Sequence, residues 1–243
     1  MHAMRTVALV GLVAGLLTSN GAAGAQPLEG RTLPALRLAY SNEVTARAEY
    51  EAYAARAEAE GLLGVRDLYR ALAQCEAEHA ARHAHLIEAS GEVPVAIAAT
   101  PTVGTTRENL ARAFSSERHE RRVRYAKLAE AVRPELAYDV LADLRWCSAA
   151  EATHAKALSE ALEGIDDLRA PHVWYACSEC GSIRGEHSHE RCACGMTGDT
   201  FLALGGGEDL REMAQPVATA PVIAWLELGL GRSFGIVAAE QEK

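Results

Sequence analysis

The chain has 243 residues, of which 49% are hydrophobic and only 5% aromatic, enough for one sizeable core and a small appendage. Its formal net charge of -9 would repel phosphate backbones and anionic lipid headgroups, so no nucleic-acid partner is expected. Six cysteines allow either disulfides or a metal site, and their spacing must decide between the two.

The N-terminus has the pattern of a cleavable signal peptide. Arg5 precedes an apolar run at residues 7–17, and Ala23-Gly24-Ala25 supplies small residues for cleavage before Gln26. The run is shorter than the roughly 20 residues of a bilayer span, which makes a retained N-terminal membrane anchor the alternative. We therefore expect a signal peptide over 1–25, export to the periplasm and no stable membrane insertion.

The next part of the chain predicts a helical bundle. Helical spacing of Ala, Leu and Glu predicts four helices, at residues 34–60, 62–89, 106–133 and 134–162. Pro94, Pro101 and Gly104 fall between the second and third, so residues 92–105 predict a long crossover. Short, long and short connections are those of a ferritin-like four-helix bundle, which we place at residues 34–163.

A linker at 164–172 leads to a small cysteine-rich domain at 173–204, and a tail of unknown structure follows at 205–243. Cys177-x-x-Cys180-Gly181 is a normal metal knuckle, in which glycine permits the turn. Cys192-x-Cys194 is one residue shorter. A four-thiolate site for zinc or iron is predicted, with disulfide pairing as the alternative in an oxidising compartment.

Two helices of the predicted bundle carry the same motif. Glu76-x-x-His79 lies in the second helix and Glu151-x-x-His154 in the fourth. Residues three apart share a helix face, so each motif can direct a carboxylate and an imidazole at one metal site. A single match in a Glu-rich helix carries little weight, because such residues are commonly solvated.

Carboxylates on the other two helices give the repeated motif its meaning. Glu43 and Glu76 lie 18 and 15 residues from Gly61, between the first two helices. Glu117 and Glu151 each lie 17 residues from Pro134, at the first turn of the fourth helix. At about 1.5 Å rise per residue these carboxylates form one layer. Oxygen and imidazole donors suit two iron or manganese ions better than copper, and iron is preferred.

Further residues resemble the rubrerythrin family over positions 36–204. Segment 42–47 (NEVTAR) resembles the family's first ligand segment, and Tyr50 falls where the family has a tyrosine beside its irons. Segment 117–120 (ERHE) resembles its paired carboxylates, and Tyr125 matches a second tyrosine position. Taken alone, each tyrosine is more often a packing residue.

The resemblance implies a mainly α protein, a ferritin-like bundle with a small C-terminal rubredoxin-like or zinc-ribbon β domain. In it Glu120 would exchange with His79 as an iron changes oxidation state, and Glu120, Tyr50 and Tyr125 are the catalytic candidates. The implied ligands of two irons are Glu43, Glu76, His79, Glu117, Glu120, Glu151 and His154. The implied ligands of a further iron or zinc ion are Cys177, Cys180, Cys192 and Cys194.

The family's activity would be reduction of hydrogen peroxide to water, with electrons delivered by an unidentified reductase through the four-cysteine iron. Family precedent passes them between the chains of a homodimer. The shortened Cys192-x-Cys194 departs from rubredoxin-like spacing and leaves iron against zinc open. The alternative is a ferroxidase or iron-handling bundle with a structural zinc ribbon. A metal-stabilised scaffold would leave the repeated Glu-x-x-His motif unexplained.

Several other residues of the helices are assigned to simpler roles. Cys75 and Cys147 adjoin the ligand motifs and are expected as buried thiols, with a bridge or a redox role as alternatives. His83, His85 and His119 are expected at the solvated surface.

Overall fold

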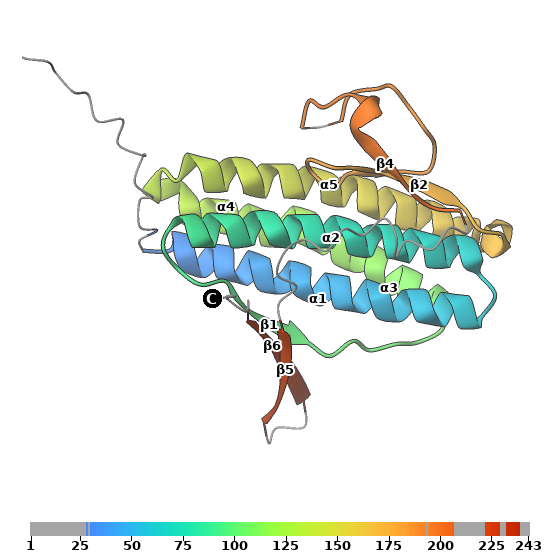
Figure 1. Cartoon of the computed structure of the whole chain (residues 1–243), viewed down its shortest axis with the longest axis horizontal. Coiled ribbons are helices and arrows are strands. Elements are labelled where there is room, and N and C mark those ends of the chain that lie inside the picture. The colour runs from blue at the N-terminus through green and yellow to red at the C-terminus, as the bar shows by residue number, and fades with distance from the viewer. Residues whose placement is uncertain (1–27, 29, 193, 207–221, 229–231, 239–243) are drawn as a thin grey trace, which may run out of the picture.

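The computed structural model describes residues 28, 30–192, 194–206, 222–228 and 232–238 (Figure 1). The predicted signal peptide at 1–25 lies outside these residues. Among the helices that the structure describes, none is long and apolar enough to cross a membrane.

The bundle consists of four long helical segments joined by one short, one long and one short connection. Helix α1 (Thr32–Ala59) turns at Gly61, whose φ of +73° suits glycine, into α2 (Leu63–Ala89). The third segment comprises α3 (Thr106–His119), the π-helix η1 (Glu120–Arg124) and α4 (Tyr125–Val132). A 3₁₀ turn, η2 (Arg133–Glu135), precedes α5 (Tyr138–Glu163). The predicted ferritin-like fold class is confirmed.

The third segment differs from the prediction in its interior and at its end. Thr105 begins it with a capping box to Glu108, as its hydroxyl and the Glu108 carboxylate satisfy each other's backbone N–H groups. The π turn interrupts the α-helical spacing, which no composition signal indicated. The following α5 begins at Tyr138 instead of Pro134, because Pro134 lies in η2.

Two buried apolar clusters lie above and below the predicted ligand layer. Along α1, Leu36 belongs to one cluster, Tyr53 to the other, and Glu43 lies between them. The reverse order holds along α2, from Leu72 to Ile87. The polar layer is therefore enclosed by apolar side chains, which lowers the local dielectric and strengthens every charge interaction there.

A small sheet covers one side of the bundle, opposite the cysteine domain (Figure 1). The crossover forms β1 (Val95–Ala99), which pairs antiparallel with β6 (Arg232–Ala238), and β6 pairs with β5 (Val222–Leu228). Hydroxyls of Ser41 and Thr45 on α1 accept hydrogen bonds from backbone N–H groups of β1. Part of the tail whose structure the sequence left open is thus a hairpin that extends the crossover strand.

The cysteine domain is a three-stranded antiparallel sheet of order β3-β2-β4. Its strands are β2 (Val173–Cys177), β3 (Ile183–Arg184) and β4 (Phe201–Gly205). The turn η3 (Ile165–Arg169) precedes it, and η4 (Gly198–Thr200) leads into β4.

Buried Asp67 on α2 ties this sheet to the bundle. Its Oδ2 accepts hydrogen bonds from the backbone N–H of His172 at 3.0 Å and of Gly206 at 3.3 Å. Its Oδ1 lies 2.7 Å from Arg66 Nη2. Trp174 adds a hydrogen bond to the Gly64 carbonyl at 3.3 Å. One carboxylate therefore fixes both ends of the domain.

We expect Asp67→Ala to destabilise the protein by about 3 kcal/mol, because it leaves buried Arg66 and two backbone N–H groups without their acceptor. For a chain of this size this lowers the melting temperature by roughly 6–12 °C in a thermal unfolding experiment. The control is Asp166→Ala, which removes only an exposed pair with Arg169. Equal melting temperatures for the two variants would contradict the assigned anchor.

Candidate metal centre

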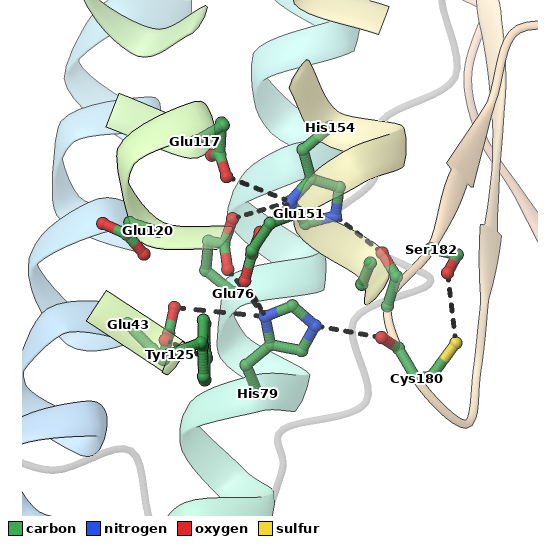
Figure 2. A network of polar contacts seen from close by, with 12 residues as sticks. Glu43, Glu76, His79, Glu117, Glu120, Tyr125, Glu151, His154, Cys180 and Ser182 are labelled. Atoms are coloured by element: carbon green, nitrogen blue, oxygen red, sulfur yellow. Dashed lines mark hydrogen bonds and ion pairs between the residues drawn. The ribbon is translucent and has the colours of Figure 1, made fainter. Parts of the chain in front are cut away.

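All six core ligands predicted from the sequence come together in one buried layer (Figure 2). Ligand atoms of Glu43, Glu76, His79 and Glu151 lie within 4.8 Å of one another. A second cluster within the same limit consists of Glu76, Glu117, Glu151 and His154. Glu76 and Glu151 belong to both clusters. The arrangement is that of two metal positions joined by shared carboxylates.

The two imidazoles are oriented for metal binding by the cysteine domain. His79 Nε2 donates to the Cys180 carbonyl at 2.9 Å, and His154 Nε2 donates to the Gly181 carbonyl at 2.8 Å. A carbonyl can only accept, so Nε2 carries the proton. With a metal ion bound, each ring would be neutral and would offer its Nδ1 lone pair to the ion; His154 Nδ1 lies on the carboxylate side, 2.8 Å from a Glu151 oxygen. A hydrogen bond of this kind orients histidine ligands in metal sites.

Unsatisfied buried oxygens show that this layer fits cations. Carboxylate oxygens of Glu43, Glu76, Glu117 and Glu151 have no hydrogen-bond partner among the described residues, although they are buried. The pKa of Glu43 is raised well above its usual range, mainly by burial and next by repulsion from Glu120. The pKa of Glu117 is raised in the same way, mainly by burial and next by repulsion from Glu151. Two divalent cations would balance the negative charge of the four carboxylates and bind their unpaired oxygens.

The three catalytic candidates surround this layer. Tyr50 donates a hydrogen bond to Glu117, and Tyr125 donates one to Glu43. Glu120 belongs to neither four-donor cluster and instead makes a close ion pair with Arg124. Burial and the charge of Glu151 raise the pKa of Glu120 to about 8, against the opposing effect of Arg124. Glu120 therefore lies beside the metal donors without joining them.

A cavity of about 340 Å³ reaches this layer from outside. It lies between α1, the crossover strand and the third helical segment, with Ile97 and Ala113 among its apolar walls. Tyr50, Glu117 and Glu120 line it as well. A small molecule in the cavity would therefore contact residues at the edge of the metal layer.

His83 was expected to be exposed, and this expectation is wrong. The residue is fully buried, and both ring nitrogens have partners there. Its Nδ1 lies 2.6 Å from Asp143 Oδ2, and its Nε2 lies 3.4 Å from the Tyr125 hydroxyl. Arg82 completes the row, with its Nε donating to Asp143 at 2.8 Å. Burial would raise the pKa of Asp143, but His83 and Arg82 outweigh it and hold that pKa below its usual value.

Sequence spacing contained a signal for this row. His83 follows His79 by one helical turn, and Asp143 precedes Glu151 by about two turns, so both share the face of a predicted ligand. The pairing of His83 with Asp143 depends on how α2 and α5 pack against each other, which the sequence spacing does not give. Cys75 and Cys147 are buried free thiols, as expected.

The four-cysteine cluster forms despite its shortened second half. Sulfur atoms of Cys177, Cys180, Cys192 and Cys194 all lie within 4.8 Å of one another, and all four are free cysteines. A hydrogen bond from Cys180 lowers the pKa of Cys177 to about 4, which favours a thiolate there. Four convergent sulfurs fit one tetrahedral iron or zinc ion.

The contact between the two metal regions lies within one chain. The carbonyls of Cys180 and Gly181 reach the histidines of their own bundle, and the expected transfer between chains stays a prediction. Arg82 strengthens this contact by donating from Nη1 to the Glu179 carbonyl at 2.7 Å. The knuckle of this chain therefore contacts the donor layer of the same chain.

Fold and site together define a ferritin-like protein with a carboxylate-rich two-metal centre and a four-cysteine centre. A family model described as rubrerythrin matches residues 35–106. The chain is 27% identical over 183 residues to rubrerythrin of Nitratidesulfovibrio vulgaris, covering 72% of this chain and 95% of that protein. It is 26% identical over 174 residues to rubrerythrin-2 of Clostridium acetobutylicum, covering 70% and 94%.

Solved structures agree with these relatives. A structure of fully reduced, all-ferrous nigerythrin is similar with a TM-score of 0.64 and 26% identity, covering 82% of this chain and 100% of nigerythrin. Bacterioferritin of Mycobacterium tuberculosis, at 20% identity and a TM-score of 0.54, shares the fold. The rubrerythrin family model thus matches part of the bundle, the predicted resemblance is confirmed, and the comparisons support a di-iron protein.

We expect Gly181→Ala to loosen the docked knuckle. Gly181 has a φ of +70°, and an added Cβ would lie 2.7 Å from His79 Nε2. Gly195→Ala is the matched control, because Gly195 has a φ of +92° and open space around it. Left-handed strain costs both variants about 1 kcal/mol, and the clash costs Gly181→Ala about 2 kcal/mol more. Denaturant unfolding measures the difference, and equal costs would contradict the docking.

We expect Glu76→Ala to hold fewer than two irons per chain, because Glu76 contributes to both clusters. Helix content should stay nearly unchanged, since the apolar clusters that stabilise the bundle are separate from this layer. Iron analysis measures the iron content, and circular dichroism measures the helix content. Glu78→Ala, two residues away and bonded to Gln74, is the control that should retain full iron. Unchanged iron in Glu76→Ala would show that the donor layer is misassigned.

Proposed function

We propose that this protein is a di-iron peroxidase that reduces hydrogen peroxide to water with electrons passed through a four-cysteine iron centre. Rubrerythrin-family proteins are oxidoreductases that use peroxide and take electrons from reductase partners. One observation carries the proposal. Both histidines of the two-metal layer are hydrogen-bonded to the knuckle that holds the cysteines.

Some residues of the layer would bind the two irons, and others would assist the reaction at them. Two irons held there would supply the two electrons that, with two protons, convert one peroxide into two waters. Glu120 lies at the cavity wall, where its carboxyl can hand a proton to a bound molecule or a water. Tyr50 and Tyr125 fix the orientation of Glu117 and Glu43 through their hydroxyl groups. Apolar clusters on both sides exclude bulk water from the layer.

Electron delivery follows from the docked knuckle. Cys180 is both a thiol of the four-cysteine cluster and the residue whose carbonyl accepts from His79, 2.9 Å away. The path from sulfur to the donor layer is therefore a few covalent bonds and one hydrogen bond within one chain. Iron, which changes oxidation state, is required in the cluster for this role, whereas zinc would make it structural.

We further propose that the protein forms a homodimer and is exported to the periplasm. The homodimer is proposed from the resemblance to rubrerythrins, beside the contact between knuckle and bundle within one chain. The periplasmic location depends on residues 1–25, outside the described part of the chain.

The test compares two oxidants by stopped-flow spectroscopy of the iron-loaded, reduced protein. We expect peroxide to reoxidise the wild-type protein faster than oxygen does. Glu120→Ala should still bind two irons through the six core donors, yet react with peroxide roughly 10²-fold or more slowly, as expected for loss of a group that assists proton transfer. Glu49→Ala, which changes another carboxylate of the same cavity, is the control.

Two outcomes would count against the peroxidase. Faster reaction with oxygen than with peroxide would favour the ferroxidase alternative. An unchanged peroxide rate in Glu120→Ala would remove Glu120 from the mechanism. A visible thiolate-to-iron band in the purified protein supports iron at the four cysteines, and zinc without such a band would make that centre structural.

A further inference from the structure

Glu120 is a buried carboxylate beside the two-metal layer that belongs to neither donor cluster. Its side chain is 7% exposed, yet it is absent from both four-donor clusters. In Figure 2 it lies to one side, with no contact drawn to the residues of the network. Something must hold this carboxylate away from the positions that two cations would occupy.

The holding group is Arg124. Its Nη1 makes a close ion pair with Glu120 Oε1, and its own side chain is 42% exposed at the cavity. Both residues belong to η1, where the Tyr125 N–H bonds to the Glu120 carbonyl. A π turn holds more residues than an α turn, so the residue four positions on comes nearly below the first. The backbone therefore places Arg124 against Glu120.

We propose that Arg124 is a positioning residue that holds the Glu120 carboxylate on the cavity wall, away from the metal donors. The proposal rests on the metal layer of the proposed function. A buried carboxylate needs a cation, and two kinds are within reach: the guanidinium outside and the metal ions inside. While Arg124 holds Glu120, a coordination position facing the cavity stays open for a small ligand. Without Arg124, Glu120 is free to join the donors.

Neighbouring arginines give a matched control. Arg121 and Arg122 lie in the same π turn but line a different cavity, of about 440 Å³, between α3 and α5. Removal of Arg122 takes one positive charge from the same segment and leaves the Glu120 pair intact. A comparison with Arg124 therefore separates the specific pair from the general charge of the turn.

The test measures metal affinity, with no peroxide present. The full chain is prepared with zinc in the four-cysteine site and the carboxylate layer metal-free, then titrated with Mn²⁺, which prefers oxygen and imidazole donors. Free Mn²⁺ is followed by its electron paramagnetic resonance signal. We expect Arg124→Met to bind Mn²⁺ about tenfold more tightly, the size expected when one charge-assisted contact stops competing with the metal.

A double-mutant cycle shows whether Arg124 acts through Glu120. In the Glu120→Gln background, Arg124→Met should change the Mn²⁺ affinity by less than about twofold, because the side chain that it would release no longer carries a charge. Arg122→Met should stay within about twofold in both backgrounds. Arg124→Lys retains the positive charge, so its Mn²⁺ affinity should stay close to that of the wild-type protein.

Three outcomes would overturn the proposal. Unchanged or weaker Mn²⁺ binding by Arg124→Met would mean that the pair does not compete with the metal. An equal gain in the Glu120→Gln background would assign the effect to charge alone. An equal gain from Arg122→Met would do the same. A failed peroxide test would leave this result standing, since the titration depends only on the metal layer.

Discussion

The burial of four carboxylates at one level of a helical bundle is the constraint on which the rest of this structure depends. Glu43, Glu76, Glu117 and Glu151 are each at most 3% exposed, and each has a carboxylate oxygen without a hydrogen-bond partner among the described residues. Such a layer is unstable by itself, because burial and mutual repulsion both oppose its charge. It becomes favourable when cations occupy the space between the oxygens. Apolar clusters on either side strengthen that attraction as much as they strengthen the repulsion.

The cysteine domain completes this layer from outside the bundle. Two carbonyls of its first knuckle fix the tautomer of both histidines, so that the free nitrogen of each ring faces inward. Gly181 makes this approach possible, because any larger residue would meet His79. The same two hydrogen bonds therefore attach the cysteine domain to the bundle and orient the histidine ligands. A change that displaces the knuckle would alter the donor set and the path for electrons together.

A second set of polar residues holds the ligands from the side. Tyr125 connects Glu43 to His83, and His83 connects to Asp143 and then to Arg82 at the knuckle. Arg82 also donates to the Glu179 carbonyl, so this row returns to the domain that orients the histidines. Buried polar groups of this kind are retained only where each finds a partner. The row links both metal regions without using a metal ligand from the cysteine cluster.

The sequence by itself determined the helices, the repeated Glu-x-x-His motif and the two cysteine pairs, because all of these depend on spacing along one chain segment. Counting residues from each connection also placed the carboxylates at one depth, since helical rise is constant. Tertiary structure alone decided the partners across helices. The pairing of His83 with Asp143 and the docking of Gly181 on His79 join residues whose separation along the chain carries no periodic signal. The C-terminal hairpin pairs with a crossover strand more than a hundred residues earlier, and backbone hydrogen bonds, which every residue type can make, leave no mark in the sequence.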